Sequence, residues 1–361
     1  MKHALELDDG QLGLVIFTAS LAATLSLAPA GWLCARRGSR VPVAVGLGLG
    51  ALALGVAPFA PSLLALVGVA FALGVGLGGT DVGANTQGVE LERRLGRRLL
   101  SPLHAAWSFG LLSGSAITAI AAAAGVGIRL QLPVVAVGIA TLLAVSVPFL
   151  LTGTAADLES ARFALPRGAL ALPAALMFCA FFVETAAMSW SAVFLSGPAG
   201  ASAALAAGAV VTYAAAMGVA RLFGDRLLAR WGIGGLARRG GLVSCAGVLL
   251  AIGTRAPVPA LVGFALVGIG CAAVVPALFR VGGSALGVAQ GAGIAAVGTA
   301  GYVGGLLNGP AIGFLARGIG LSSALGLVAI ASGVIALLGS RLTSDAPAPG
   351  RATPGELTAS R

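Results

Sequence analysis

The sequence predicts an all-α polytopic membrane protein built from two related helical bundles. Of its 361 residues, 58% are hydrophobic and 9% are charged, and the mean hydropathy of +1.01 lies far above soluble averages. A motif in the first half returns in the second: Gly110 to Ile117 reads GLLSGSAI and Gly305 to Ile312 reads GLLNGPAI, with an offset of 195 residues. Two repeated halves of spanning helices are typical of secondary transporters.

Apolar stretches long enough to cross a bilayer follow one another along the chain. A spanning helix needs about 20 predominantly apolar residues. Eleven stretches are expected to cross: 11–33, 41–60, 62–88, 101–125, 131–152, 168–196, 202–223, 239–254, 257–280, 286–316 and 320–340. The 56 glycines fit closely packed membrane helices, because small residues let helix backbones approach one another.

The repeat also divides the chain into domains. We expect an N-terminal bundle of about five helices at 1–152, a cytoplasmic linker at 153–167, a six-helix bundle at 168–340 and a disordered cytoplasmic tail at 341–361.

The second bundle has one helix more than the first. An offset of about 190 residues maps helix 202–223 onto 12–33, but it maps 168–196 onto positions before Met1. We therefore expect twelve helices, with the first one missing because Met1 is a misassigned or alternative start. The alternative is an eleven-helix protein with unequal halves.

The net charge of +10 is explained by membrane topology. If the first ten residues face outward, the loops and tail that face the cytoplasm hold 17 basic residues and the outward segments hold four, with Arg221 at a helix end. This is the positive-inside bias of membrane proteins, and it places the C-terminus in the cytoplasm. A basic patch for nucleic acid or a specific lipid is the weaker alternative.

The sequence points to no enzyme, cofactor or metal centre. Its four cysteines have no paired spacing, and its two histidines offer no metal cluster. It has no Walker loop, and the G-x-G-x-x-G pattern at 74–79 lies inside an apolar helix with no preceding strand. We expect no cofactor and no enzymatic activity.

Ionisable residues inside the bilayer are functional candidates, because each costs at least about 2.5–3.5 kcal/mol on insertion scales. Glu184 lies about sixteen residues into helix 168–196, somewhat beyond the bilayer midplane. We expect it to bind substrate or a coupling proton; a hydrogen bond that ties helices together is the alternative. Trp190 lies on a different face, where it is either a sugar-stacking platform or an interface anchor.

Further polar candidates lie on three other helices. Asp81 and Asn85 share one face of helix 62–88, and His104 lies one turn into the next helix at a similar depth. We expect them to handle substrate or protons, with Asp81 and His104 as a titratable pair; a structural gate pair and a structural histidine are the alternatives. Asn308 with Pro310 is expected to break helix 286–316 and free carbonyls for a binding site; a packing kink is the alternative.

The segment from Gly31 to Arg40, GWLCARRGSR, resembles the G-x-L-x-D-R-x-G-x-R loop signature of the major facilitator superfamily. Ala35 replaces the aspartate of that signature, whereas Asp225 and Arg226 keep the acid–base pair in the second half. The resemblance implies a twelve-helix fold whose inner gate involves these loops. The gating residues that it implies are Gly31, Arg36, Arg37, Gly38, Arg40, Asp225 and Arg226.

Three other segments are similar to the bacterial sugar-permease branch near fucose permease. They are Asp81 to Asn85, Leu103 to Gly110 and Glu184 to Ser191. The resemblance implies a multi-pass protein of the bacterial inner membrane.

These features favour a secondary transporter that moves a small polar solute, a sugar or related metabolite, by alternating access with proton coupling. Its expected partners are the solute, protons and the lipid bilayer, with no nucleic acid and no obligate protein partner. A proton-coupled drug or metabolite efflux antiporter is the nearest alternative, although the G-P-x-x-G-G-like motif of such antiporters lacks its proline in helix 101–125. A non-transporting membrane scaffold or sensor is the alternative from another class.

Overall fold

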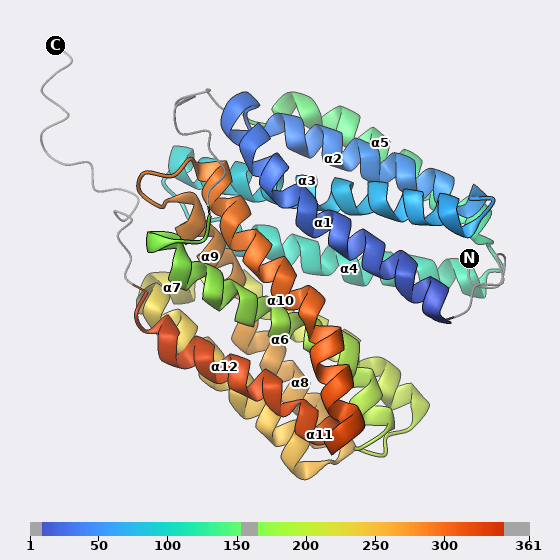
Figure 1. Cartoon of the computed structure of the whole chain (residues 1–361), viewed down its shortest axis with the longest axis vertical. Helices are drawn as coiled ribbons and strands as arrows, with labels where there is room; N and C mark the ends of the chain where they lie inside the picture. Colours follow the sequence, from blue (N-terminus) through green and yellow to red (C-terminus); the bar gives the residue numbers. More distant parts are fainter. Residues whose placement is uncertain (1–8, 153–164, 343–361) are drawn as a thin grey trace, which may run out of the picture.

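The computed structural model describes residues 9–152 and 165–342, and this part of the chain is almost entirely helical (Figure 1). Most of the expected tail and of the expected linker lies outside the described residues. The helices gather into two bundles, one from each half of the chain.

The N-terminal bundle contains five long helices. They are α1 (Asp9–Arg37), α2 (Arg40–Val56), α3 (Leu63–Leu95), α4 (Leu100–Ala123) and α5 (Ile128–Ser146), with the short 3-10 turns η1 (Ala57–Phe59) and η2 (Val147–Phe149). Gly38, with φ of 77°, makes the turn between α1 and α2, and Gly96, with φ of 60°, ends α3. The hydroxyl of Ser62 accepts a hydrogen bond from the Ala65 amide and caps the start of α3.

The C-terminal bundle begins with the 3-10 turn η4 (Gly168–Leu170). Its helices are α6 (Ala171–Ser196), α7 (Ala203–Thr254), α8 (Pro257–Cys271), α9 (Val274–Gly283), α10 (Gln290–Ile319), α11 (Leu321–Ala324) and α12 (Gly326–Gly339). Among the described residues, eight helical stretches are long and apolar enough to span a membrane. The helices α4 and α10, of 24 and 30 residues, lie alongside them in the bundles.

Helix α7 consists of two arms joined at Gly232, whose φ of 66° and ψ of 173° interrupt the helix. In the first arm, residues 213–224 run parallel to residues 268–273. In the second arm, residues 240–247 run antiparallel to residues 263–270. The chain therefore turns back at Gly232 and crosses twice, as predicted, but the segment between the predicted crossings is helical up to the turn.

The break expected in a C-terminal helix lies elsewhere than predicted. Helix α10 is continuous through Pro310, so the prediction of a break at Asn308 and Pro310 is wrong. The proline removes one helical hydrogen bond without ending the helix, and the adjacent Asn308 is buried and ties α10 to α6. The predicted helix 257–280 is instead divided at residues 272–273, between α8 and α9.

The two bundles meet at one end of the molecule, which we call the arginine-rich end because it carries Arg36, Arg37, Arg93, Arg94 and Arg239. One buried apolar cluster there contains residues of both bundles, whereas the second buried cluster belongs to the C-terminal bundle. Gly31 of α1 packs on the backbone of Gly291 in α10. Helices α1 and α10 then diverge toward the opposite end (Figure 1).

Helix α4 packs mainly against α7 of the other bundle and only slightly against α3 of its own. Its repeat counterpart, α10, packs closely on α6, where Gly305 faces Thr185. The residue of α4 that matches Gly305 is Gly110, and nothing lies within 4 Å of the position of a Cβ there. The described part of the N-terminal bundle therefore contains no counterpart of α6.

Candidate functional site

A cavity of about 240 Å³ lies between the bundles. It is lined by Asp81, Ala84, Asn85, Leu100, Leu103, His104, Trp107, Phe181, Glu184, Thr185, Met188, Arg221, Val275, Phe279 and Tyr302. The structure therefore brings four predicted site residues together, namely Asp81, Asn85, His104 and Glu184.

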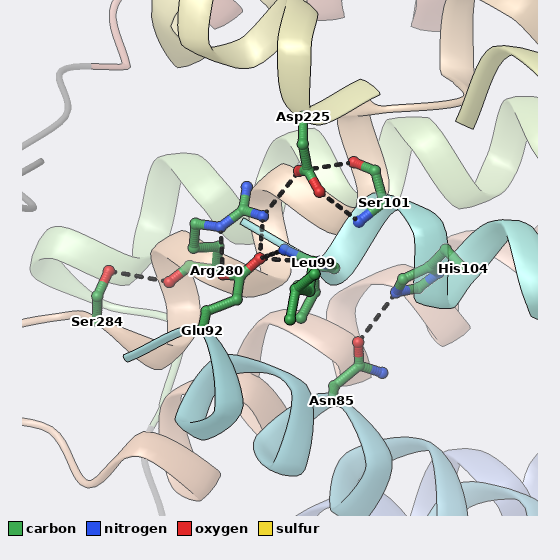
Figure 2. Close-up of polar contacts among 9 residues, drawn as sticks. Asn85, Glu92, Leu99, Ser101, His104, Asp225, Arg280 and Ser284 are labelled. Atoms are coloured by element: carbon green, nitrogen blue, oxygen red, sulfur yellow. Dashed lines mark hydrogen bonds and ion pairs between the residues drawn. The ribbon is translucent and has the colours of Figure 1, made fainter. Parts of the chain in front are cut away.

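The N-terminal bundle contributes a chain of polar groups to this cavity. The side-chain amide of Asn85 donates to Oδ1 of Asp81 at 3.0 Å. The carbonyl oxygen of Asn85 is therefore left to accept from Nε2 of His104 at 3.0 Å (Figure 2). The proton of a neutral His104 is therefore assigned to Nε2. The ring of His104 stacks on Phe279 of α9, with 5.9 Å between centroids. Tyr302 of α10, in the other bundle, lines the same cavity as Asp81.

The C-terminal bundle contributes a buried ion pair. Oε1 of Glu184 in α6 lies 3.3 Å from Nη2 of Arg221 in α7. The Arg221 side chain is 2% exposed and that of Glu184 is 14% exposed. Nη1 of Arg221 reaches the other bundle, where it donates to Oγ of Ser108 at 2.6 Å. Each bundle therefore places one carboxyl in the cavity, and Arg221 connects that of Glu184 to the opposite bundle.

Trp190 and Asn308 do not line the cavity. Nε1 of Trp190 donates to Oδ1 of Asn308 at 3.2 Å, and Nδ2 of Asn308 donates to the Phe182 carbonyl at 3.1 Å. These bonds tie α6 to α10 within one bundle. Of the two interpretations of each residue, the packing role is the one that this geometry supports.

A group of charged side chains closes the arginine-rich side of the cavity. We call Glu92, Ser101, Asp225 and Arg280 the interface lock. Arg280 of α9 donates from Nε to Oε2 of Glu92 at 2.7 Å and from Nη2 to Oδ1 of Asp225 at 3.0 Å (Figure 2). Glu92 belongs to α3 of the N-terminal bundle, so this salt bridge joins the two bundles.

The interface lock also holds the start of α4. The amides of Leu99 and Leu100 donate to Oε1 of Glu92 at 2.6 and 2.8 Å. The amide and hydroxyl of Ser101 donate to Asp225 at 3.3 and 3.0 Å. The first amides of a helix have no partner within the helix, and a helix start favours nearby negative charge. At the start of α4 these amides donate to two acids, Glu92 of the N-terminal bundle and Asp225 of the C-terminal bundle.

The predicted gating residues divide into packing, exposed and interface-lock positions. Gly31 and Gly38 serve packing and the turn already described. Arg36 and Arg37 are exposed, with Arg36 stacked on the Trp32 ring at 4.7 Å. Arg226 is exposed and Arg40 is half-buried, and neither forms a salt bridge with another described residue. Asp225 pairs with Arg280 of the same bundle, and the gating role expected of Asp225 and Arg226 stays a prediction.

Several residues of the site were missed by sequence reasoning. Arg221 and Arg280 were counted only as topology signals, and Glu92 was not considered. A signal for Arg280 was available, because Glu92 lies 188 residues before it, close to the repeat offset. Trp107 and Tyr302 carried no comparable signal, since aromatic residues are common in membrane helices.

The comparisons with known proteins agree with this architecture. A family model described as the Major Facilitator Superfamily matches residues 1–307. An uncharacterized MFS-type transporter of Yersinia pestis is 32% identical over 334 residues, which cover 91% of this chain and 86% of that protein.

Solved structures show the same fold at low identity. FucP, a fucose:proton symporter of E. coli, superposes in its outward conformation with a TM-score of 0.77 and 17% identity, covering 92% of this chain and 90% of that chain. The proton:xylose symporter XylE gives a TM-score of 0.72 and 14% identity, covering 93% and 87%. The predicted fold class and family are therefore confirmed. The chain belongs to the major facilitator superfamily, whose members are multi-pass membrane transporters.

Proposed function

We propose that this protein moves a small polar solute, a sugar or related metabolite, together with protons by alternating access. The observation that carries the proposal is the cavity between the bundles, into which each bundle places one carboxyl group, Asp81 or Glu184. Ionisable groups are costly inside a bilayer, so a pair of them in a shared cavity favours a transport role. The names of FucP and XylE as sugar:proton symporters support the same class.

The lining suits a solute that carries several hydroxyl groups. Carboxyl oxygens accept hydrogen bonds, whereas Asn85, Thr185 and the hydroxyl of Tyr302 can donate or exchange them. Trp107 is 59% exposed and presents aromatic surface, on which the apolar face of a sugar ring can stack. Few polar groups placed among apolar ones are typical of small-molecule sites.

The contacts between the bundles support an alternating-access cycle. Residues 1–152 and 168–340 would be the two bodies that rock around the cavity. We infer that the arginine-rich end faces the cytoplasm of a bacterial inner membrane, as does the C-terminus, because basic residues favour that side. The conformation described here would then be closed to the cytoplasm.

Flux in proteoliposomes tests the proposal. Vesicles would be loaded with unlabelled hexoses, pentoses or polyols, and entry of the radiolabelled solute would be followed with and without an inward proton gradient. We expect the gradient to drive accumulation of at least one solute. Glu184→Gln should reduce that accumulation at least tenfold while leaving solute exchange without a gradient.

The matched control is Glu90→Gln, because Glu90 pairs with Arg93 and Arg94 on the surface of α3. It should leave both measurements unchanged. If a solute is exchanged but its uptake does not respond to the proton gradient, the proposed proton coupling is contradicted. Solute leaving against an inward proton gradient would identify an efflux antiporter, and no flux of any solute would favour a scaffold or sensor.

A further inference from the structure

We propose that Arg221 is the positioning residue that connects the protonation state of Glu184 to the contact between the two bundles. The inference rests on the proposed proton-coupled function. Arg221 is 1% exposed, which makes it the most buried basic residue in the described part of the chain. Sequence reasoning places it at a helix end and gives it no role.

The guanidinium of Arg221 has partners in three directions. Nη2 lies 3.3 Å from Glu184 in α6, and Nε donates to the carbonyl of Ala272 at 3.2 Å. That carbonyl belongs to the junction between α8 and α9, where the helix is interrupted. Nη1 donates to Oγ of Ser108 at 2.6 Å and to the carbonyl of His104 at 3.4 Å, both in α4 of the other bundle.

These bonds have a fixed relative geometry, because a guanidinium is planar and its donors form a rigid fork. A movement that releases one partner therefore disturbs the others. Two of the three directions stay within the C-terminal bundle, and the third crosses to α4. The side chain of Arg221 thus transmits a change at Glu184 to the bundle interface.

The charges around Glu184 determine what such a change does. The charged and titratable groups that face it are Arg221 and Tyr213 of α7, Cys271 of α8 and, across the cavity, Asp81 of α3, His104 of α4 and Tyr302 of α10. Helix α12 presents none among its residues 326–339, and Arg280 of α9 is already bound by Glu92 and Asp225. Arg221 is therefore the basic group that balances an ionised Glu184.

Protonation of Glu184 removes the negative charge that balances Arg221. An arginine keeps its charge in proteins, and a buried charge without a partner is strongly unfavourable. Arg221 must then turn toward the cavity, where water or solute can solvate it, and its bond to Ser108 is lost. One helical turn before Arg221, Gly218 of α7 also packs against Ser108 and Phe109 of α4. Loss of the bond to Ser108 therefore loosens the interface between α4 and α7.

The experiment measures interface opening as a function of pH in the full-length protein in lipid nanodiscs. Spin labels at Leu95 and Leu286 report on the arginine-rich end, and labels at Leu64 and Val258 report on the opposite end, since all four side chains are exposed. The four native cysteines would be replaced by alanine. Double electron–electron resonance then gives the fractions of open and closed molecules.

In the parent protein we expect the arginine-rich end to open as the pH falls. Glu184→Gln should be open at least tenfold more often at neutral pH and should lose the pH dependence. Ser108→Ala should also favour opening, by about fivefold, but should keep the pH dependence because Glu184 still titrates. In the double variant the two effects should not add, because both act through Arg221.

The control is Ser113→Ala, since Ser113 lies on the same helix and bonds only its own backbone at Phe109. It should behave like the parent protein. Additive effects of Ser108→Ala and Glu184→Gln would overturn the inference, as would an unchanged pH response in Glu184→Gln. If Glu184→Gln loses proton-driven uptake but keeps the parent pH response of the distances, the proposed function stands and only the role of Arg221 fails.

Discussion

Glu92 and Arg280 form a salt bridge across the bundle interface although their spacing of 188 residues is close to the offset of the repeat. Arg280 is also bound by Asp225 of its own bundle. The position that matches Asp225 in the first half, 190 residues earlier, is Ala35. The first half therefore supplies one acid, Glu92, and the second half supplies the base Arg280 together with the acid Asp225. The two halves share a single interface lock in the described part of the chain.

Removing the acid of the first half should open this interface. Glu92→Gln leaves the largely buried Arg280 with Asp225 alone and takes a charged partner from the start of α4. A buried charge left without any partner costs about 3–5 kcal/mol. Because Arg280 keeps Asp225, we expect a smaller loss, of about tenfold in the closed population. Distances between labels at Leu95 and Leu286 would measure it, and unchanged distances would contradict the role of the interface lock.

Close packing of the bundles should be sensitive to a single methyl group. A Cβ at Gly31 would lie 2.7 Å from the carbonyl oxygen of Gly291, which is too close for an unshifted backbone. Gly31→Ala should therefore reduce the closed population at the arginine-rich end at least about tenfold. Gly68→Ala is the matched control, because the corresponding Cβ at Gly68 has nothing within 4 Å. Equal behaviour of the two variants would show that this contact does not matter for closure.

Trp107, which lines the cavity, and Trp190, which was predicted from the sequence, should separate binding from stability. Trp107 lines the cavity and is 59% exposed, whereas Trp190 is bonded to Asn308 inside one bundle. Trp107→Ala should raise the half-saturating solute concentration about tenfold with little change in melting temperature. Trp190→Ala should lower the melting temperature, because removing a packed aromatic side chain costs about 3–5 kcal/mol, and should leave solute affinity unchanged. The reverse pattern would exchange their roles.

The polar chain of the N-terminal bundle should depend on its central amide. Asn85→Leu removes the bonds that orient both Asp81 and His104. Because two buried polar groups then lose a partner, solute affinity should fall about ten- to a hundredfold. Binding by isothermal titration calorimetry would measure this, with Thr141→Val as a control on the exposed face of α5. Unchanged affinity would place the solute away from this chain.

The fold could be predicted from the sequence because a bilayer leaves few options. Long apolar stretches must form helices there, and the repeat assigns them to two halves. The same argument found Asp81, Asn85, His104 and Glu184, since polar groups in membrane helices need a reason to be there. What failed was orientation around the helix axis. Asn308 and Trp190 satisfy each other rather than facing the cavity, and one sequence does not show such a pairing.

The residues that connect the bundles were harder to predict. Arg221 and Arg280 belong to a chain rich in arginine, and the topology bias explained them both without a second role. Their roles depend on partners that are distant in the sequence: Ser108 lies 113 positions before Arg221, and Glu92 lies 188 positions before Arg280. The interrupted helix was predicted at Pro310, but it lies at residues 272–273, just before Pro276. The missing amide of Pro276 leaves the Ala272 carbonyl without its helical donor, and that carbonyl accepts from Arg221.

The weak attachment of α4 to its own bundle has a mechanical consequence. Gly110 has no neighbour on its open side, and the best-packed side of the helix lies against α7. Helix α4 can therefore part from either body during rocking, because breaking the contact of Ser108 with Arg221 separates it from α7, whereas splitting the hydrogen bond of His104 to Asn85 separates it from α3. Protonation of Glu184 would select the first of these two sliding surfaces, so that α4 moves with the N-terminal body.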